Sequence, residues 1–165
     1  MPGFSNIKVH LKVLSSNIVI IHSVGMIDFD KFFMQEALKL AKIAYEEDEV
    51  PIGAVVACGN KIIGKGYNQV EKLNDPTAHA EILAITAACN FLGSKYLDKC
   101  TIYVTLEPCM MCTGALREAQ VQRLVYAATD SSNRKKQPDL FQVQGGLMEA
   151  EASELIKSFF KKKRL

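Results

Sequence analysis

The chain has no strong excess of charge of either sign. Its 165 residues include 20 Lys and Arg against 18 Asp and Glu, which gives a formal net charge of +2 at pH 7. A dedicated nucleic-acid-binding protein often carries a larger basic excess, although a local basic patch can do the same work. Net charge therefore neither identifies nor excludes a nucleic-acid partner.

Long hydrophobic runs are also missing. The most apolar early stretch, Asn17 to Ile21, is too short to span a bilayer, and no basic n-region or cleavage site accompanies it. We therefore expect no membrane partner and no secretory signal. Residues 1–25 differ in pattern from the rest of the chain, because a helical pattern begins directly after Met26 and Asp28. We interpret residues 1–25 as an N-terminal extension, not native or poorly ordered, and residues 26–165 as a single domain.

Cysteines are few and odd in number. Five cysteines without a secretory signal indicate a cytoplasmic protein with reduced thiols. In that compartment a Cys-x-x-Cys pair more often binds metal or performs redox chemistry than forms a structural disulfide. Cys58, Cys89 and Cys100 lie among apolar neighbours, and we interpret them as small core residues.

The order of the predicted elements indicates an α/β fold. Apolar residues recur at intervals of three and four over Phe29–Glu46, which predicts an amphipathic helix capped by Asp28. Two strands joined by a hairpin turn are expected at Ile52–Ala57 and Ile62–Tyr67. The remaining predictions are helices at Ala78–Asn90, Cys109–Ala119 and Glu149–Phe160, and strands at Thr101–Leu106, Arg123–Ala128 and Leu140–Gln144. This order predicts a mixed sheet between helices, with parallel pairing in its second half.

Two short segments, Thr77-Ala-His79-Ala-Glu81 and Glu107-Pro-Cys109-Met-Met-Cys112, contain the residues suited to chemistry. Three soft or borderline ligands, His79, Cys109 and Cys112, suit Zn²⁺ and leave its fourth tetrahedral position open. A closed structural zinc site would need a fourth Cys or His, and a redox dithiol would not need the histidine. We regard both as the less favoured interpretations.

Glu81 follows the predicted ligand His79 by two residues. Within a regular helix the two side chains would point about 200° apart. We therefore expect them at the junction between a loop and a helix, where His79 reaches the metal and Glu81 faces a water bound there. The alternative is a solvent-facing carboxylate that stabilises the helix N-terminus.

The His-x-Glu and Pro-Cys-x-x-Cys patterns together resemble the zinc-dependent nucleobase deaminases of the cytidine/deoxycytidylate deaminase superfamily. The resemblance implies a three-layer α/β/α cytidine-deaminase-like fold with a five-stranded sheet. It also implies one zinc ion per chain on His79, Cys109 and Cys112. Glu81 would be the catalytic proton carrier, which takes the proton of the attacking water and protonates the departing ammonia.

Three further segments narrow the resemblance to the bacterial tRNA adenosine deaminases, which convert the wobble adenosine to inosine. They are Glu49–Val55, Asn74–Glu81 and Tyr103–Cys109. Carried over by position, Asn68, Val50 and Ala80 would hold the base, and the protein would be a homodimer that binds the tRNA anticodon loop. Asn68 suits this role because a carboxamide both donates to and accepts from a purine edge.

The sequence departs from that family after Asp130. The family continues with a Lys-x-Gly-Ala-x-Gly-Ser-like stretch and a longer loop that helps to grip the anticodon, whereas this chain has Ser131–Pro138. Arg134, Lys135 and Lys136 could contact phosphates there, although a short basic loop is more often solvated. Two alternatives therefore stay open: a deaminase of a free base or nucleoside, guanine or cytosine, and a non-catalytic zinc-stabilised interaction module.

Overall fold

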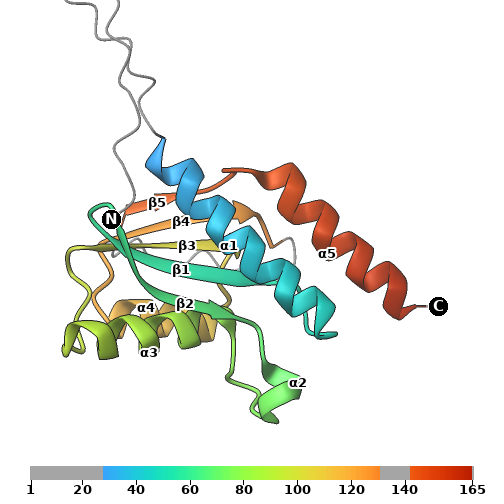
Figure 1. The fold of residues 1–165 in the computed structure, drawn as a ribbon, viewed down its shortest axis with the longest axis horizontal. Helices are drawn as coiled ribbons and strands as arrows, with labels where there is room; N and C mark the ends of the chain where they lie inside the picture. Colours follow the sequence, from blue (N-terminus) through green and yellow to red (C-terminus); the bar gives the residue numbers. More distant parts are fainter. Residues whose placement is uncertain (1–27, 131–141, 165) are drawn as a thin grey trace, which may run out of the picture.

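The strands form one five-stranded sheet in the order β2-β1-β3-β4-β5 (Figure 1). A computed structural model describes residues 28–130 and 142–164 of the chain. The strands are β1 (Gly53–Cys58), β2 (Lys61–Tyr67), β3 (Cys100–Leu106), β4 (Arg123–Ala128) and β5 (Gln142–Gln144). The helices are α1 (Phe29–Glu46), α2 (Val70–Leu73), α3 (Ala80–Leu92), α4 (Met110–Glu118) and α5 (Glu149–Lys163).

The pairing confirms the predicted mixed sheet. Strand β1 pairs antiparallel with β2 and with β3, whereas β3, β4 and β5 run parallel. This pairing places the start of β1 beside the ends of β2 and β3, at the same end of the strands. The segments before β1, after β2 and after β3 therefore meet there, and they carry Val50, Asn68 and Cys109.

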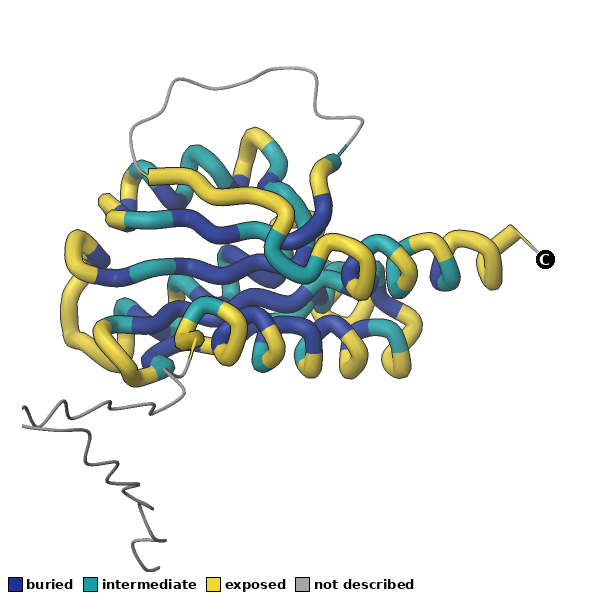
Figure 2. Tube along the Cα trace, turned by 90° about the horizontal axis from the view of Figure 1, so that it is seen from above, coloured by how far each residue is buried: buried dark blue, intermediate teal, exposed yellow. Residues whose placement is uncertain are grey.

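Helices cover both faces of the sheet. α1 and α5 lie on one face, and α3 and α4 lie on the other (Figure 1). Val55 and Ala57 of β1 join the buried cluster under α1, whereas Ala54 and Val56 join the cluster under α3. Because both faces are covered, the central strands are buried along most of their length, while β5 at the edge is exposed (Figure 2).

An ion pair ties the start of α1 to the sheet. Asp28 caps the helix by accepting from the Lys31 amide at 3.1 Å. Asp30 then accepts from Arg123 Nη1 and Nη2 at 2.8 and 2.6 Å, and from the Tyr103 hydroxyl at 2.6 Å. The hydrogen bonds from Arg123 hold the pKa of Asp30 below its usual value. This half-buried carboxylate therefore joins α1 to β3 and β4.

Glycine lets α3 lie unusually close to β2. A Cβ built on Gly66 would lie 2.3 Å from the Ala80 carbonyl oxygen and 2.7 Å from the Ala84 nitrogen. A Cβ built on Gly64 would come similarly close to Ala84 and Ala88. The three alanines are fully buried. The depth of α3 on the sheet therefore depends on glycine in β2, and α3 begins directly after His79.

The structure adjusts several predicted elements. The sequence predicts no helix between Tyr67 and Ala78, but this segment contains the one-turn helix α2. Cys100 is buried as predicted, whereas Cys58 and Cys89 are only partly buried and pack at the margin of the α3-side cluster. α5 extends to Lys163, beyond the predicted Phe160. Residues 1–25 and the loop residues Arg134, Lys135 and Lys136 lie outside the described residues.

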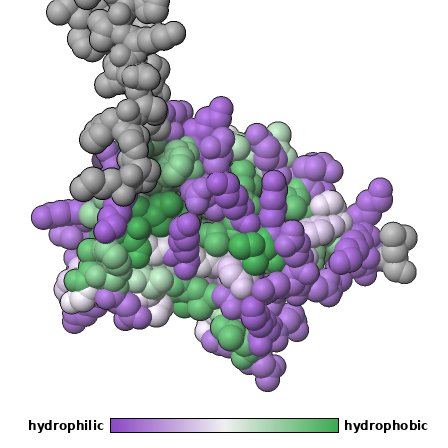
Figure 3. Space-filling view, in the orientation of Figure 1, coloured by the Kyte–Doolittle hydropathy of each residue, from purple (hydrophilic) through white to green (hydrophobic). Residues whose placement is uncertain are grey.

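The surface drawn in Figure 3 is mostly hydrophilic, with hydrophobic residues showing in separate areas between charged ones. Within the described ranges, no helix combines the length and the apolar character needed to cross a bilayer.

Candidate metal centre

The three predicted ligands lie together at the starts of two helices. His79 is the N-cap of α3, Cys109 is the N-cap of α4, and Cys112 lies in the first turn of α4. His79 Nδ1 is 3.7 Å from Cys109 Sγ and 3.4 Å from Cys112 Sγ. The three ligand atoms all lie within 4.8 Å of one another.

These separations fit a tetrahedral zinc ion. Zinc bonds of about 2.0–2.1 Å to nitrogen and 2.3 Å to sulfur place neighbouring ligand atoms about 3.6 Å apart. No fourth His, Cys, Asp or Glu from residues 28–130 and 142–164 completes the group. The described residues therefore offer three candidate ligands, the number found in catalytic zinc sites, and not the four of a structural site.

The position of Glu81 separates the two interpretations offered for it. The side chain is 3% exposed, so it is not the solvent-facing carboxylate of the alternative interpretation. Among the described residues, its Oε2 is fully buried and has no hydrogen-bond partner. Burial raises the pKa of Glu81 above its usual value. A buried oxygen without a partner is costly, so it marks a place where a water or substrate group is expected.

Burial also affects the thiols. It raises the pKa of Cys112 strongly, and the neighbouring Glu81 carboxylate adds to the shift. A metal must therefore displace the Cys112 proton when it binds.

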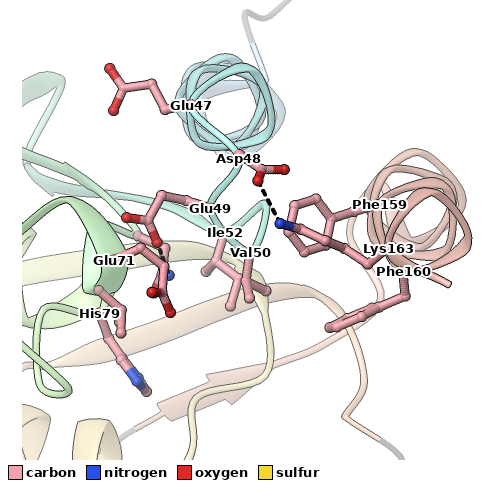
Figure 4. Close-up of a pocket in the computed structure, with 12 residues that line it drawn as sticks. Glu47, Asp48, Glu49, Val50, Ile52, Glu71, His79, Phe159, Phe160 and Lys163 are labelled. Atoms are coloured by element: carbon pink, nitrogen blue, oxygen red, sulfur yellow. Dashed lines mark hydrogen bonds and ion pairs between the residues drawn. The ribbon is translucent and has the colours of Figure 1, made fainter. Parts of the chain in front are cut away.

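A cavity of about 750 Å³ opens beside this group. Val50 and Asn68 are among its lining residues. His79 lies on one side of it, and Phe159 and Phe160 of α5 lie on the other (Figure 4). Ala80, the third residue expected to hold the base, is fully buried in the core cluster and is not among the lining residues.

Two features of this cavity were not predicted. The first is the wall formed by α5, whose Lys163 is held at 2.5 Å by Asp48 at the end of α1 (Figure 4). The second is the burial of Glu49, which is 1% exposed and accepts hydrogen bonds from Asn68 and Lys72. The one signal for Glu49 in the sequence is its position, because an acidic residue at a helix C-terminus opposes the dipole.

Residues 27–164 match the MafB19-like deaminase family. This chain belongs to that family of deaminases. The cytidine-deaminase-like fold implied by the resemblance is therefore confirmed, and a His/Cys/Cys metal site accords with the zinc dependence of such enzymes.

Three proteins show which deaminases this family member is similar to. The tRNA-specific adenosine deaminase of Aquifex aeolicus (strain VF5) is 43% identical over 148 residues, which cover 81% of this chain and 95% of that protein. A solved structure from work on A-to-I editing by tRNA:A34 deaminases is 41% identical, with a TM-score of 0.72 over 75% of this chain and 98% of the other. The guanine deaminase of Bacillus subtilis is 34% identical, with a TM-score of 0.58 over 80% and 74% of the two chains.

Proposed function

We propose that this deaminase hydrolyses adenosine to inosine at the wobble position of a tRNA, with one zinc ion per chain. The observation that carries the reaction type is the buried Glu81 beside three metal ligands. The substrate is supported by the identity of 43% to a tRNA-specific adenosine deaminase over nearly the whole of that protein. A non-catalytic zinc module would be expected to lack Glu81 or to have a fourth ligand, and the described residues show neither feature.

His79, Cys109 and Cys112 would hold the zinc. When bound, zinc activates a water molecule for attack on the amino-bearing carbon of the base. The overall reaction consumes one water and releases inosine and ammonia.

Glu81 would move the protons of this reaction. Its carboxylate would take one proton from the attacking water and deliver it to the ring nitrogen. It would then take the second proton, from the hydroxyl added to the carbon, and pass it to the amino group, which leaves as ammonia. The burial that raises the pKa of Glu81 suits this role, because a carboxyl with a raised pKa both accepts and returns a proton readily.

The base would bind between Val50 and Asn68, next to the start of α3. Because the side chain of Ala80 is buried in the core, Ala80 would contribute through its backbone. The cavity is large for a single base, because it continues from His79 to Phe159, Phe160 and Lys163 on α5. That length accommodates nucleotides flanking the reacting base, on which aromatic side chains can stack. The last turn of α5 is basic, with Lys161, Lys162 and Lys163, and adds cations for phosphate contacts.

A free base is the second candidate substrate, and the observation that favours it is the likeness to a guanine deaminase at 34% identity. The two candidates separate by substrate. Zinc-loaded protein is incubated with an anticodon stem-loop RNA containing adenosine 34, and separately with guanine, adenine, cytosine and cytidine. Inosine in the digested RNA supports the proposal. Ammonia from a free base, with no inosine in any adenosine-34 RNA, would replace it with the second candidate.

We further propose a homodimer. Met110 and Met111, at the start of α4 beside the metal ligands, are 65% and 38% exposed. Exposed apolar side chains next to a site are typical of a contact surface. Sedimentation equilibrium of the full chain should give twice the monomer mass, and Met110→Lys should shift it towards one monomer. The cytoplasmic location expected from the cysteine content stays a prediction.

A further inference from the structure

We propose that Glu49 is a positioning residue that orients Asn68 for recognition of an adenine base. This inference rests on the proposed function, in which Asn68 contacts the base. It extends that function to a buried acid that does not itself touch the reacting atoms.

Both oxygens of the Glu49 carboxylate are occupied by specific donors. Oε2 accepts from Asn68 Nδ2 at 3.1 Å, and Oε1 accepts from the Lys72 backbone amide at 2.8 Å. Glu49 is 1% exposed and Asn68 is 4% exposed, so water competes little for these bonds. The Asn68 backbone is held as well, because its amide donates to the Ile52 carbonyl at 3.0 Å.

This contact fixes which way the Asn68 side-chain amide is turned. A carboxylate accepts hydrogen bonds and cannot donate them, so the amide must present its NH₂ group to Glu49. In the described part of the chain, no donor reaches Asn68 Oδ1. The carbonyl oxygen and the second N–H of Asn68 therefore remain for a ligand in the cavity that Asn68 lines.

A fixed pair of one donor and one acceptor distinguishes the purines. Adenine offers an N7 acceptor beside an N6 amino donor, and an asparagine amide bonds both at once. Guanine offers two acceptors, N7 and O6, on the same edge. Held by Glu49, Asn68 thus complements adenine, whereas an amide free to turn would lose that preorganised arrangement.

Glu49 also holds the one-turn helix beside Asn68. The N-cap of α2, Gln69, makes no side-chain capping bond, and the Lys72 amide is satisfied by Glu49 instead. The Lys72 side chain is paired separately with Glu47 at 2.9 Å. Glu49 therefore sets Asn68 and the adjacent cavity wall, where Val70 and Glu71 lie, relative to the end of α1.

At position 49, an apolar side chain would fill the space of the Glu49 side chain without the cost of burying a carboxylate. The backbone reaches the position through Asp48, which has a positive φ of 64°. An acid at this site is accounted for by the two hydrogen bonds that it accepts.

The test is Glu49→Gln, which keeps the size of the side chain and its acceptor for Lys72 but turns an NH₂ group towards Asn68. We expect kcat/KM for the adenosine-34 stem-loop to fall about 5- to 150-fold, the range of one bidentate base contact. The melting temperature and zinc content should stay near those of the unaltered protein. The matched control is Glu46→Gln, which removes the same charge from an exposed position at the end of α1 and should leave kcat/KM unchanged.

Combining variants tests whether Glu49 affects kcat/KM through Asn68. In an Asn68→Ala background, Glu49→Gln should cause almost no further loss of kcat/KM, because the two residues act as one unit. If the losses multiply instead, Glu49 acts without Asn68 and the inference is overturned.

A second measurement keeps this test separate from the proposed function. The side-chain NH₂ of Asn68 gives its own NMR signals, whose hydrogen exchange should be slow in the unaltered protein and faster in Glu49→Gln. Unprotected Asn68 signals in the unaltered protein would overturn the inference. Protected signals in a protein that forms no inosine would mean instead that the proposed function has failed.

Discussion

The depth of α3 on the sheet controls the metal centre, and Gly66→Ala tests this dependence. The new Cβ would lie 2.3 Å from the Ala80 carbonyl oxygen, whereas ordinary van der Waals contact begins near 3.4 Å. Since the obstacle is helix backbone, α3 must retreat by about 1 Å. His79 is the N-cap of α3, so it would move away from Cys109 and Cys112 on α4.

Two effects of this retreat can be estimated. Overpacking of this kind costs about 1–3 kcal/mol, which lowers the melting temperature of a chain of this size by about 2–12 °C. Displacing one ligand from the other two should weaken zinc binding by about 10- to 100-fold, the usual effect of disturbing a ligand's support. Thermal unfolding of the zinc-free chain and a competition titration with a chromophoric chelator measure the two effects separately.

Gly114→Ala is the matched control for this substitution. Gly114 lies inside α4, and a Cβ there meets nothing within 4 Å. Alanine at such a helix position should stabilise the protein by roughly 0.5–1 kcal/mol without changing zinc affinity. If Gly66→Ala were as stable and bound zinc as tightly as Gly114→Ala, the close approach of α3 would not determine the site.

Three further predictions concern charges and thiols. Asp30→Asn should lower the free energy of unfolding at pH 7 by about 1.5–3 kcal/mol. The pKa of Asp30 is lowered in the folded state, so the difference in unfolding free energy between the unaltered protein and the variant should shrink as the pH falls below 3.8. Urea titrations measure this difference, and a value at pH 3 equal to that at pH 7 would contradict the reasoning. Cys112→Ser should remove most of the bound zinc detected by metal analysis, whereas Cys100→Ser, at a buried thiol away from the site, should retain it. Zinc affinity should rise with pH up to the range where Cys112 ionises, because burial raises its pKa and zinc displaces its proton, and a flat pH profile would contradict this.

Sequence patterns predicted the sheet and the grouping of His79, Cys109 and Cys112 because both depend on local signals. The interval of three and four over Phe29–Glu46 matches α1 residue for residue, and the short hairpin between the first two strands limits their pairing. His79 and Glu81 were expected at a junction between a loop and a helix because of helix geometry. Side chains two positions apart in a helix point in nearly opposite directions, so these two could not share one face. In each case a few adjacent residues contained the information.

The features that were missed depend on contacts between distant segments. α2 forms where Lys72 donates its amide to Glu49, which lies 23 residues away, and its own N-cap provides no signal. In the sequence, Glu49 resembles the last acid of a solvated helix end, whereas in the structure it is buried against Asn68 and Lys72. The α5 wall of the cavity likewise depends on contacts between α1 and α5, such as that of Tyr45 with the buried Phe159, which local periodicity does not encode.

Glu81 is proposed to move protons at a zinc site that acts on adenosine in RNA. The most direct measurement is inosine formation at position 34 of an anticodon stem-loop, under single turnover, by unaltered protein and by Glu81→Gln, each loaded with one zinc per chain. We expect inosine from the unaltered protein and a rate lower by about 10²–10⁴-fold from the variant, at equal zinc content. A near-normal rate from Glu81→Gln would contradict the proton role, and no inosine from the unaltered protein would contradict the substrate.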